Sequence, residues 1–502
     1  MRYLLGLDIG TSGTKTALFN ENGETIATAT YGYDLFQPKV GWAEQNPEDW
    51  WDACVNGIKD VVQKSGVNNF DIKGIGLSGQ MHGLVMLDKE NNIIRNSIIW
   101  CDQRTEKECE EITKNIGKER LIQITGNPAL TGFTLSKLLW VRNNEPENYS
   151  KINKILLPKD YIRFKLTGIF ATEVSDASGM QMLDINKRDW SEELLNDLEI
   201  DKSILADVYE SIVVSGHVTE EAAKLTCLQK GTGVVGGAGD QAAGAIGNGI
   251  VKEGVISTVI GSSGVVFAST DTPKFDKLGR VHTLCHAVPG KWHVMGVTQG
   301  AGLSFKWFKE TFCNKEVEDC KTNGNNIYDV LTDKASKSEP GSNGVVYLPY
   351  LMGERTPHLD PNVKGGFLGV SLINNHNDFI RSILEGVSFS LKNCLDIIED
   401  MNVNIEDIRV SGGGAESEVW RKILCDIFQY KLTTVKASEG PALGVAILAG
   451  VGTGVYESVE EACDKIIKGK DTVIPNVSLK ERYEQVYSVY NSLYDKIKDI
   501  RI

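Results

Sequence analysis

The first apolar and polar positions of the chain predict a β-hairpin. An almost entirely apolar run, 3–8, ends in Asp8, and a second apolar run, 16–19, follows a turn made of glycines, hydroxyl residues and Lys15. Short apolar runs bounded by glycine are typical of buried strands. The segment therefore predicts a strand, a tight turn and a second strand, with Asp8 at the end of the first.

The same pattern occurs again in the middle of the chain. An apolar run at 255–260 leads into a glycine and serine turn at 261–264 and then into the apolar run 265–267. Because the hairpin is made twice, we expect two halves of related architecture, and 502 residues are enough for more than one domain. We place the boundary near residue 250, with domains at 1–248 and 249–502.

Elsewhere the spacing of apolar positions predicts alternating strands and helices. Helical spacing is found at 105–122 and 134–143, and at 378–400 it predicts a long helix with one buried face. A strand at 408–411 runs into glycines and then into an amphipathic helix. Such a mixture predicts an α/β fold.

Composition and charge narrow the class of protein. The chain is 41% hydrophobic and 24% charged, and it has no run of about 18 apolar residues. A net charge of −14 disfavours nucleic acid or an anionic membrane as a partner. The ten cysteines form no C-x-x-C pair, so we expect reduced, mostly buried thiols. We expect a cytoplasmic protein without a membrane span.

The glycine turns are candidate phosphate-binding loops. Glycine lets the backbone approach a ligand, and free N–H groups and hydroxyls can point at phosphate oxygens. The first turn has neither the P-loop spacing nor a dinucleotide fingerprint, because the chain re-enters a strand after it. An ordinary hairpin turn is the alternative for each loop.

Asp240 and the loop 79–83 complete the candidate chemistry. Asp240 lies where a strand at 234–235 gives way to an alanine-rich helix, and a turn or helix-cap role is its structural alternative. Phosphoryl transfer needs a carboxylate to take the proton of the attacking hydroxyl, and an aspartate with an ordinary pKa of about 4 is ionised at pH 7. His82 is expected to be exposed in its loop.

Two longer segments resemble signatures of the FGGY carbohydrate kinases. Residues 132–144 are similar to the N-terminal signature of that family, and residues 365–370 with 378–385 are similar to the C-terminal one. The resemblance runs from about residue 3 to about residue 460. It implies a two-domain, ribonuclease H-like fold of the actin and hexokinase type, with mixed sheets and flanking helices around a central cleft.

The resemblance also implies roles for individual residues. Asp240 would be the catalytic base, and Asp8 would organise the Mg²⁺ that accompanies ATP, through water. The acceptor sugar would be bound by Met81, His82, Asp240, Gln241 and, by position only, Asp102. The phosphates of ATP would contact Thr11, Ser12, Gly13, Thr14, Gly261, Ser262, Ser263 and Gly264. Gly413, Gly414 and Glu418 would flank adenosine, although Glu418 replaces an amide found in some relatives.

The loop 79–83 favours D-xylulose as the acceptor, because it is similar to the loop of xylulose kinases, whereas glycerol kinases carry an Asn-Gln-Arg-Glu type of sequence there. Gln241 weakens the case for D-xylulose, since many xylulose kinases have Asn and glycerol kinases have Gln at that position. Kinases of L-ribulose, gluconate or glycerol are the alternatives within the family. An actin-like or chaperone-like ATPase is the alternative from another class.

Two further expectations concern Arg355 and assembly. Arg355, in the segment 353–357, is expected to make a salt bridge within its loop, with phosphate binding as the alternative. The sequence leaves the oligomeric state open, with a homodimer as one option.

Overall fold

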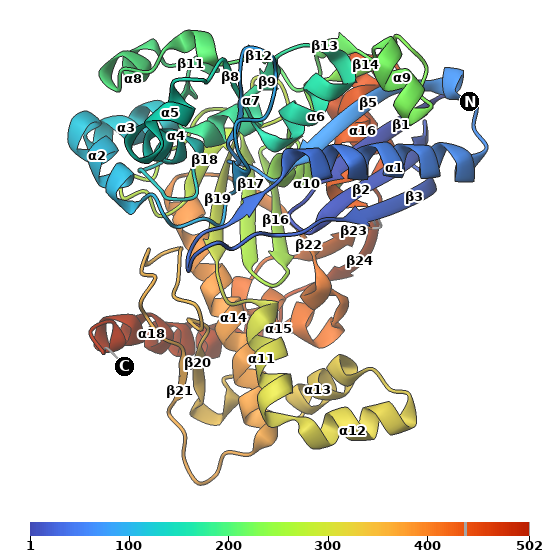
Figure 1. Cartoon of the computed structure of the whole chain (residues 1–502). Coiled ribbons are helices and arrows are strands. Elements are labelled where there is room, and N and C mark those ends of the chain that lie inside the picture. The colour runs from blue at the N-terminus through green and yellow to red at the C-terminus, as the bar shows by residue number, and fades with distance from the viewer. Residues whose placement is uncertain (436–438, 501–502) are drawn as a thin grey trace.

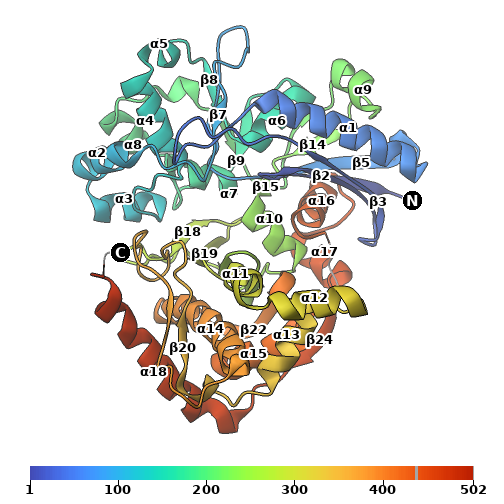
Figure 2. The same ribbon diagram turned by 60° about the horizontal axis from the view of Figure 1, so that its bottom comes forward.

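The computed structural model describes residues 1–435 and 439–500, which form two lobes, each built on a seven-stranded mixed sheet (Figures 1 and 2). The first-lobe sheet has the strand order β13-β14-β5-β1-β2-β3, with β15 paired to β5. The second-lobe sheet has the order β18-β19-β17-β16-β22-β23-β24. Helices flank both sheets, so the predicted two-domain α/β fold is confirmed.

The first-lobe sheet consists of β1 (Tyr3–Ile9), β2 (Gly13–Asn20), β3 (Thr25–Gly32), β5 (Ile72–Gly79), β13 (Val214–His217), β14 (Gly233–Val235) and β15 (Ala238–Gly239). The main helices of this lobe are α1 (Pro47–Ser65), α2 (Glu106–Ile116), α3 (Lys118–Thr125), α4 (Thr134–Asn144), α6 (Pro158–Thr167), α7 (Val174–Ala177), α9 (Glu220–Thr226) and α10 (Asp240–Gly247).

The second-lobe sheet consists of β16 (Gly254–Ile260), β17 (Gly264–Thr270), β18 (His282–Cys285), β19 (Trp292–Thr298), β22 (Ile405–Ser411), β23 (Leu432–Val435) and β24 (Gly469–Val473). The later helices are α11 (Gly302–Phe312), α12 (Asn314–Asn323), α13 (Ile327–Ser336), α14 (His376–Asp400), α15 (Glu418–Phe428), α16 (Gly440–Gly452), α17 (Val459–Ile466) and α18 (Lys480–Ile497). A separate short pair is formed by β20 (Val346–Leu348) and β21 (Gly366–Leu368).

The two sheets repeat one arrangement, as the two hairpins predicted. In the first lobe β1 pairs antiparallel with β2 and parallel with β5, and β5 pairs parallel with β14. In the second lobe β16 pairs antiparallel with β17 and parallel with β22, and β22 pairs parallel with β23. Both predicted hairpins are confirmed, while the boundary at 248/249 stays a proposal.

Helix α16 comes late in the chain but packs on the first-lobe sheet and on α10 (Figure 2). The approach is so close that a Cβ on Gly6 would lie 2.0 Å from the carbonyl oxygen of Ala442. A Cβ on Gly444 would lie 1.9 Å from the carbonyl oxygen of Ala243. Since α10 begins at Asp240, this backbone-to-backbone packing fixes the helix that carries the candidate base.

Two helix predictions differ from the structure in detail. The segment 105–122 is two helices, α2 and α3, because Gly117 between them adopts a φ of 87° that a continuing helix does not allow. The long helix α14 is buried on most of its surface rather than on one face, since β17, β19, β20, α11, α13, α15 and α18 surround it.

Two expectations from composition are met in the described residues. All ten cysteines are free and most are buried. Within 1–435 and 439–500, no helix combines the length and the apolar character needed to cross a membrane.

Candidate active site

Asp8 and Asp240 come together because their strands are neighbours in one sheet. Strand β1 ends just beyond Asp8, and its partner β5 places Ser78 directly opposite Asp8. The hydroxyl of Ser78 donates a 2.8 Å hydrogen bond to Asp8 Oδ1. On the other side of β5, β15 pairs in parallel and ends at Gly239, so that α10 begins with Asp240 at the same sheet edge. Parallel neighbours deliver their carboxyl ends to one edge, where ligands of open α/β sheets bind.

The pKa values of both carboxyl groups are raised. Burial is the main cause that raises the pKa of Asp8, with the Ser78 hydrogen bond and the charge of Lys15 opposing it. Burial and, after it, the charge of Asp8 raise the pKa of Asp240 to about 7, while hydrogen bonds from Gln241 oppose the rise. The expectation of an ordinary pKa near 4 for Asp240 is therefore wrong, because the sequence does not show that this carboxyl is buried beside another.

The candidate sugar loop, residues 79–83, packs on Gly239, which immediately precedes Asp240. A Cβ on Gly239 would lie 3.0 Å from Cγ of Met81, so the glycine that precedes Asp240 makes room for this side chain. A Cβ on Gly179 would lie 2.6 Å from the ring of His82. The structure thus brings Met81 to Gly239, the residue before the candidate base, while His82, next in the loop, packs on Gly179.

His82 is half-buried rather than exposed as expected. Its ring stacks on Phe133 at 4.4 Å between centroids, and its Nδ1 lies 2.8 Å from the carbonyl oxygen of Gly179. A carbonyl only accepts, so Nδ1 carries the hydrogen and Nε2 is left as an acceptor. Burial first, and then the charge of Lys137, lower the pKa of His82 well below its usual value. The neutral ring can therefore accept a hydrogen bond from a sugar hydroxyl.

Lys137 is a residue of the candidate site that sequence reasoning missed. It is fully buried on α4, and its Nζ donates to the carbonyl oxygens of His82 at 2.8 Å and Gly132 at 2.6 Å. Burial lowers its pKa to about 7. The signal in the sequence was a lone lysine among the apolar residues of a predicted helix. In the structure, Lys137 holds the backbone of the candidate sugar loop through its hydrogen bond to His82.

A fully buried group of charges lies behind the site and was also missed. Lys159 Nζ pairs with Asp160 at 2.7 Å and with Glu173 and Asp176 at 3.4 Å. Glu173 accepts a hydrogen bond from the hydroxyl of Ser175, whose oxygen in turn accepts one from the N–H of Gly239. The group therefore fixes the backbone immediately before Asp240. Nothing in the sequence distinguishes these charges from surface ones.

The first candidate phosphate loop, residues 11–14, is fixed by side chains from the same lobe. Gln45 Nε2 donates to the carbonyl oxygen of Thr11 at 2.7 Å, and Trp100 Nε1 donates to the hydroxyl of Thr11 at 2.9 Å. The N–H of Gly10 closes the turn on the carbonyl oxygen of Gly13 at 3.1 Å. Ser12 and Thr14 lie in this same turn and at the start of β2.

The second candidate phosphate loop, 261–264, is closed by a hydrogen bond from the N–H of Gly261 to the carbonyl oxygen of Ser263. The first residues of α11 donate to its backbone, with Gly302 N 2.8 Å from the carbonyl oxygen of Gly261. The candidate adenosine loop is adjacent, because a Cβ on Gly414 would lie 2.4 Å from Ile260. Gly413 lies in the same short turn, and Glu418 follows in the first turn of α15.

Asp102 is already engaged by the protein. Its carboxylate accepts hydrogen bonds from Arg104 Nε at 3.0 Å to each oxygen and from the N–H of Ala43 at 2.6 Å, and the side chain is fully buried. Contact of Asp102 with the sugar stays a prediction.

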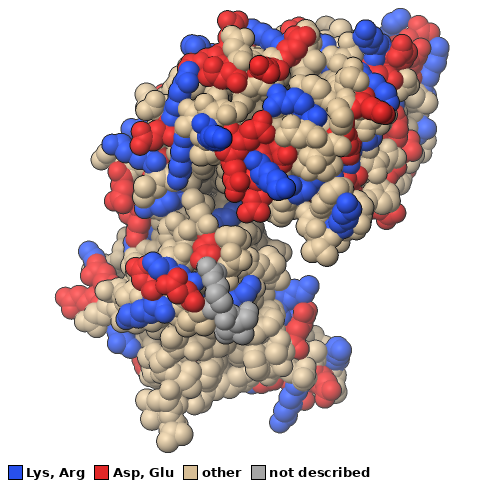
Figure 3. All heavy atoms as spheres, turned by 60° about the vertical axis from the view of Figure 1, so that its left-hand side comes forward, with Lys and Arg blue, Asp and Glu red and all other residues tan. Residues whose placement is uncertain are grey.

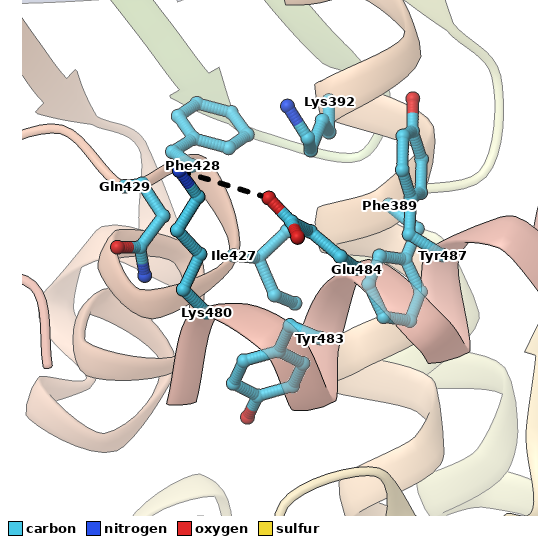
Figure 4. A pocket seen from close by; sticks show the side chains of 9 residues that line it. All are labelled: Phe389, Lys392, Ile427, Phe428, Gln429, Lys480, Tyr483, Glu484 and Tyr487. Atoms are coloured by element: carbon cyan, nitrogen blue, oxygen red, sulfur yellow. Dashed lines mark ion pairs between the residues drawn. The ribbon is translucent and has the colours of Figure 1, made fainter. Parts of the chain in front are cut away.

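The molecular surface is hollowed between the two lobes (Figure 3). A separate cavity of about 210 Å³ lies between α14, α15 and α18 (Figure 4). It is lined by Phe389, Lys392, Ile427, Phe428, Gln429, Lys480, Tyr483, Glu484 and Tyr487, none of which belongs to the site described above.

The two lobes repeat one arrangement, and each carries a glycine loop on its hairpin. Together with the aspartate pair at one sheet edge, these are the features of a phosphotransferase that acts on a small molecule. The N-terminal domain of the FGGY family of carbohydrate kinases matches residues 3–247, and the C-terminal domain matches residues 256–453. The chain belongs to the FGGY family of carbohydrate kinases, which excludes the actin-like and chaperone-like alternatives.

Individual relatives match over the full length. The chain is 38% identical to a xylulose kinase of Bacillus subtilis over 500 residues, covering 100% of this chain and 98% of the relative. The crystal structure of ligand-bound xylulose kinase from Lactobacillus acidophilus matches with a TM-score of 0.93 at 27% identity, over 100% of this chain and 99% of the other. A gluconate kinase from Lactobacillus acidophilus matches with a TM-score of 0.92 at 27% identity, over 99% and 98%.

Proposed function

We propose that this carbohydrate kinase transfers the terminal phosphoryl group of ATP to the terminal hydroxyl of D-xylulose, with Asp240 as the general base. The packing of Met81 against Gly239 carries this proposal, since Gly239 immediately precedes the proposed base and Met81 and His82 are neighbours in the proposed sugar loop. The full-length similarity to a xylulose kinase supports the choice of sugar.

In the proposed reaction Asp240 accepts the proton of the attacking hydroxyl. A pKa of about 7 suits a base that works near neutral pH. At that pH a large fraction of Asp240 is ionised, and its carboxylate is basic enough to accept the proton of the hydroxyl. His82 orients the sugar through Nε2, and Gln241 lies next to the base in the chain. Thr11, Ser12, Gly13 and Thr14 are proposed to bind phosphates from the first lobe, and Gly261, Ser262, Ser263 and Gly264 from the second.

Gly413, Gly414 and Glu418 are proposed to flank adenosine. Closure of the two lobes would exclude water that otherwise competes with the sugar for the phosphoryl group.

Asp8 is the residue proposed to hold Mg²⁺. Within the described residues no cluster of three or more His, Cys, Asp or Glu side chains could hold a metal by itself. Mg²⁺ usually keeps several waters and binds one or two carboxylates together with substrate phosphates. The half-buried carboxylate of Asp8, fixed by Ser78, fits that mode, and the ion would neutralise negative charge on the phosphates.

The test is ADP release over a panel of D-xylulose, L-ribulose, D-gluconate and glycerol. We expect D-xylulose to give the highest kcat/KM, and the choice of sugar is overturned if another member of the panel does so. Gluconate is the main alternative acceptor in this panel, because a gluconate kinase shares the fold along its whole length. Replacing Asp240 with Asn should abolish transfer while ATP still binds, and retained turnover would refute the role of Asp240.

A further inference from the structure

Gln45 is a buried side chain to which the proposed reaction gives no role. It lies in β4 (Glu44–Gln45), which pairs with β7 (Ser97–Ile98), and the next residue, Asn46, caps the start of α1. Gln45 is 1% exposed. Its backbone is therefore held on both sides, and its side chain extends from this support to two loops of the candidate site.

The amide of Gln45 is hydrogen-bonded to both of these loops. Its Nε2 donates to the carbonyl oxygen of Thr11, in the first candidate phosphate loop, at 2.7 Å. Its Oε1 accepts a 2.7 Å hydrogen bond from Nε2 of Gln80, in the candidate sugar loop. Gln80 immediately precedes Met81, and Thr11 immediately precedes Ser12. This Gln80–Gln45–Thr11 link therefore connects the loop proposed to bind the sugar with a loop proposed to bind phosphates.

The neighbours of Gln45 allow only one orientation of its amide. A carbonyl oxygen can only accept, so the group that faces Thr11 must be the NH₂. The indole Nε1 of Trp50 can only donate, and it lies 3.3 Å from Oε1 of Gln45. Oε1 is thus fixed as the acceptor for Gln80. A side chain that lacks either the donor or the acceptor cannot form the link.

The Gln80 end of the link is fixed as well. The N–H of Gln80 donates to the carbonyl oxygen of Ile9, the last residue of β1, at 2.8 Å, and the residue is 1% exposed. Among the residues that the structure describes, its Oε1 is buried without a hydrogen-bond partner. A buried polar atom without a partner lowers stability, so this end of the amide contributes nothing favourable to the fold. The side chain of Gln80 therefore acts through its bond to Gln45.

The spacing of the two loops matters for phosphoryl transfer. The reacting atoms must approach to about 3–3.5 Å with the right alignment, and a displacement of about 1 Å can lower the rate about 100-fold. The ladder between β1 and β5 ends at the pair Ile9 and Gly79, before either loop. The link continues the connection between the two chain segments beyond the end of this ladder.

We propose that Gln45 is a positioning residue, which holds the candidate sugar loop and the first candidate phosphate loop at a fixed spacing so that the sugar hydroxyl and the phosphoryl group meet in register. This rests on the proposed function, because it takes each loop as the site of one substrate. Gln45 acts through Gln80 and through the carbonyl of Thr11. Its loss should therefore lower the rate of transfer rather than the affinity for either substrate.

The experiment measures kcat, both KM values and the ADP released without sugar in a set of variants. Gln80→Met breaks the sugar end of the link and leaves Gln45 Oε1 bonded to Trp50. Gln45→Glu keeps the size and the acceptor but loses the donor to Thr11. Gln45→Met breaks both ends. Trp50→Phe is the matched control, because it removes a buried hydrogen bond to the same oxygen but none to either loop.

We expect each Gln45 and Gln80 variant to lower kcat about 10- to 100-fold, with both KM values within about threefold of the wild type. The ADP released without sugar should not change, because attack by water does not use the sugar loop. Gln45→Met combined with Gln80→Met should be no slower than Gln45→Met alone, since both break one link. Trp50→Phe should keep kcat within about threefold of the wild type.

Four results would overturn the role of Gln45. They are a kcat close to that of the wild type in both Gln80→Met and Gln45→Glu, an equal fall in kcat in Trp50→Phe, a double variant slower than Gln45→Met, and a raised KM with unchanged kcat, which would indicate binding rather than spacing. The sugar panel tests the proposed function separately, because the variants are assayed with the acceptor that the wild type prefers. If Gln45→Met does not fold, Gln80→Met decides, because it leaves Gln45 Oε1 with a donor.

Discussion

Replacing Asp240 with Asn should stabilise the protein while it abolishes catalysis, because the native carboxylate is held where its charge is unfavourable. The pKa of Asp240 rises from 3.8 to about 7 on folding. Since each pH unit corresponds to about 1.4 kcal/mol, a charged Asp240 lowers the free energy of unfolding at pH 8 by at most about 4 kcal/mol. Asparagine has nearly the same shape and carries no charge.

The sign of the pH dependence follows from the two pKa values. Between pH 3.8 and pH 7 the unfolded chain has ionised Asp240 and the folded protein has not, so wild-type stability falls as the pH rises through this window. The advantage of the Asn variant should therefore grow from about 1.5 kcal/mol at pH 5 to about 4 kcal/mol at pH 8. For 502 residues that melt together, about 1 kcal/mol corresponds to about 1 °C in Tm.

The assay is thermal unfolding without substrates at pH 5 and pH 8, with Asp319→Asn, an exposed position on α12, as the control. We expect the Asp240→Asn variant to melt about 4 °C above the wild type at pH 8 and about 1.5 °C above it at pH 5, and the control to change by less than about 1 °C. An equal or lower Tm at pH 8, or a difference independent of pH, would refute the reasoning that Asp240 is a buried charge.

Three further predictions concern the site and its support. The kcat/KM of the wild type should fall about tenfold per pH unit below about pH 7, because the protonated Asp240 cannot act as a base, and a rate that stays flat to pH 5.5 would contradict this. His82→Ala should raise the KM for the sugar about tenfold through loss of the Nε2 acceptor, with the KM for ATP unchanged as the internal control. Lys159→Met leaves the buried Glu173 and Asp176 without their lysine partner, while Asp160 keeps its ion pair with Arg163, and should destabilise the fold by about 3–5 kcal/mol in denaturant unfolding. Lys364→Met, which removes an exposed charge, should change the stability little, and equal stability of the two variants would rule out a structural role for the buried charges.

The repeated hairpin could be predicted from the sequence because glycine turns and short apolar runs are local signals. The strand-to-helix junction at Asp240 and the glycine turn before α15 could be predicted for the same reason. The equivalence of the two sheets then followed, since similar local patterns fold into similar pairings of strands.

Other features depend on contacts between distant segments, which single positions do not reveal. The placement of α16 on the first lobe requires the backbone of Gly6 to meet that of Ala442. The buried ion group around Lys159 reads in the sequence as ordinary surface charge. The salt bridge expected for Arg355 within its loop is wrong, since Arg355 takes part in no ion pair among the described residues.

The sequence by itself determined the family, the two glycine loops and the identity of the aspartates, since each depends on residue type and short spacing. Only the tertiary structure decided how those residues behave. It brought Asp240, half-buried, near Asp8 and so raised its pKa, and it stacked His82 on Phe133 in the neutral form. Charge state and pairing depend on burial and on neighbours from other elements, and these exist only once the chain has folded.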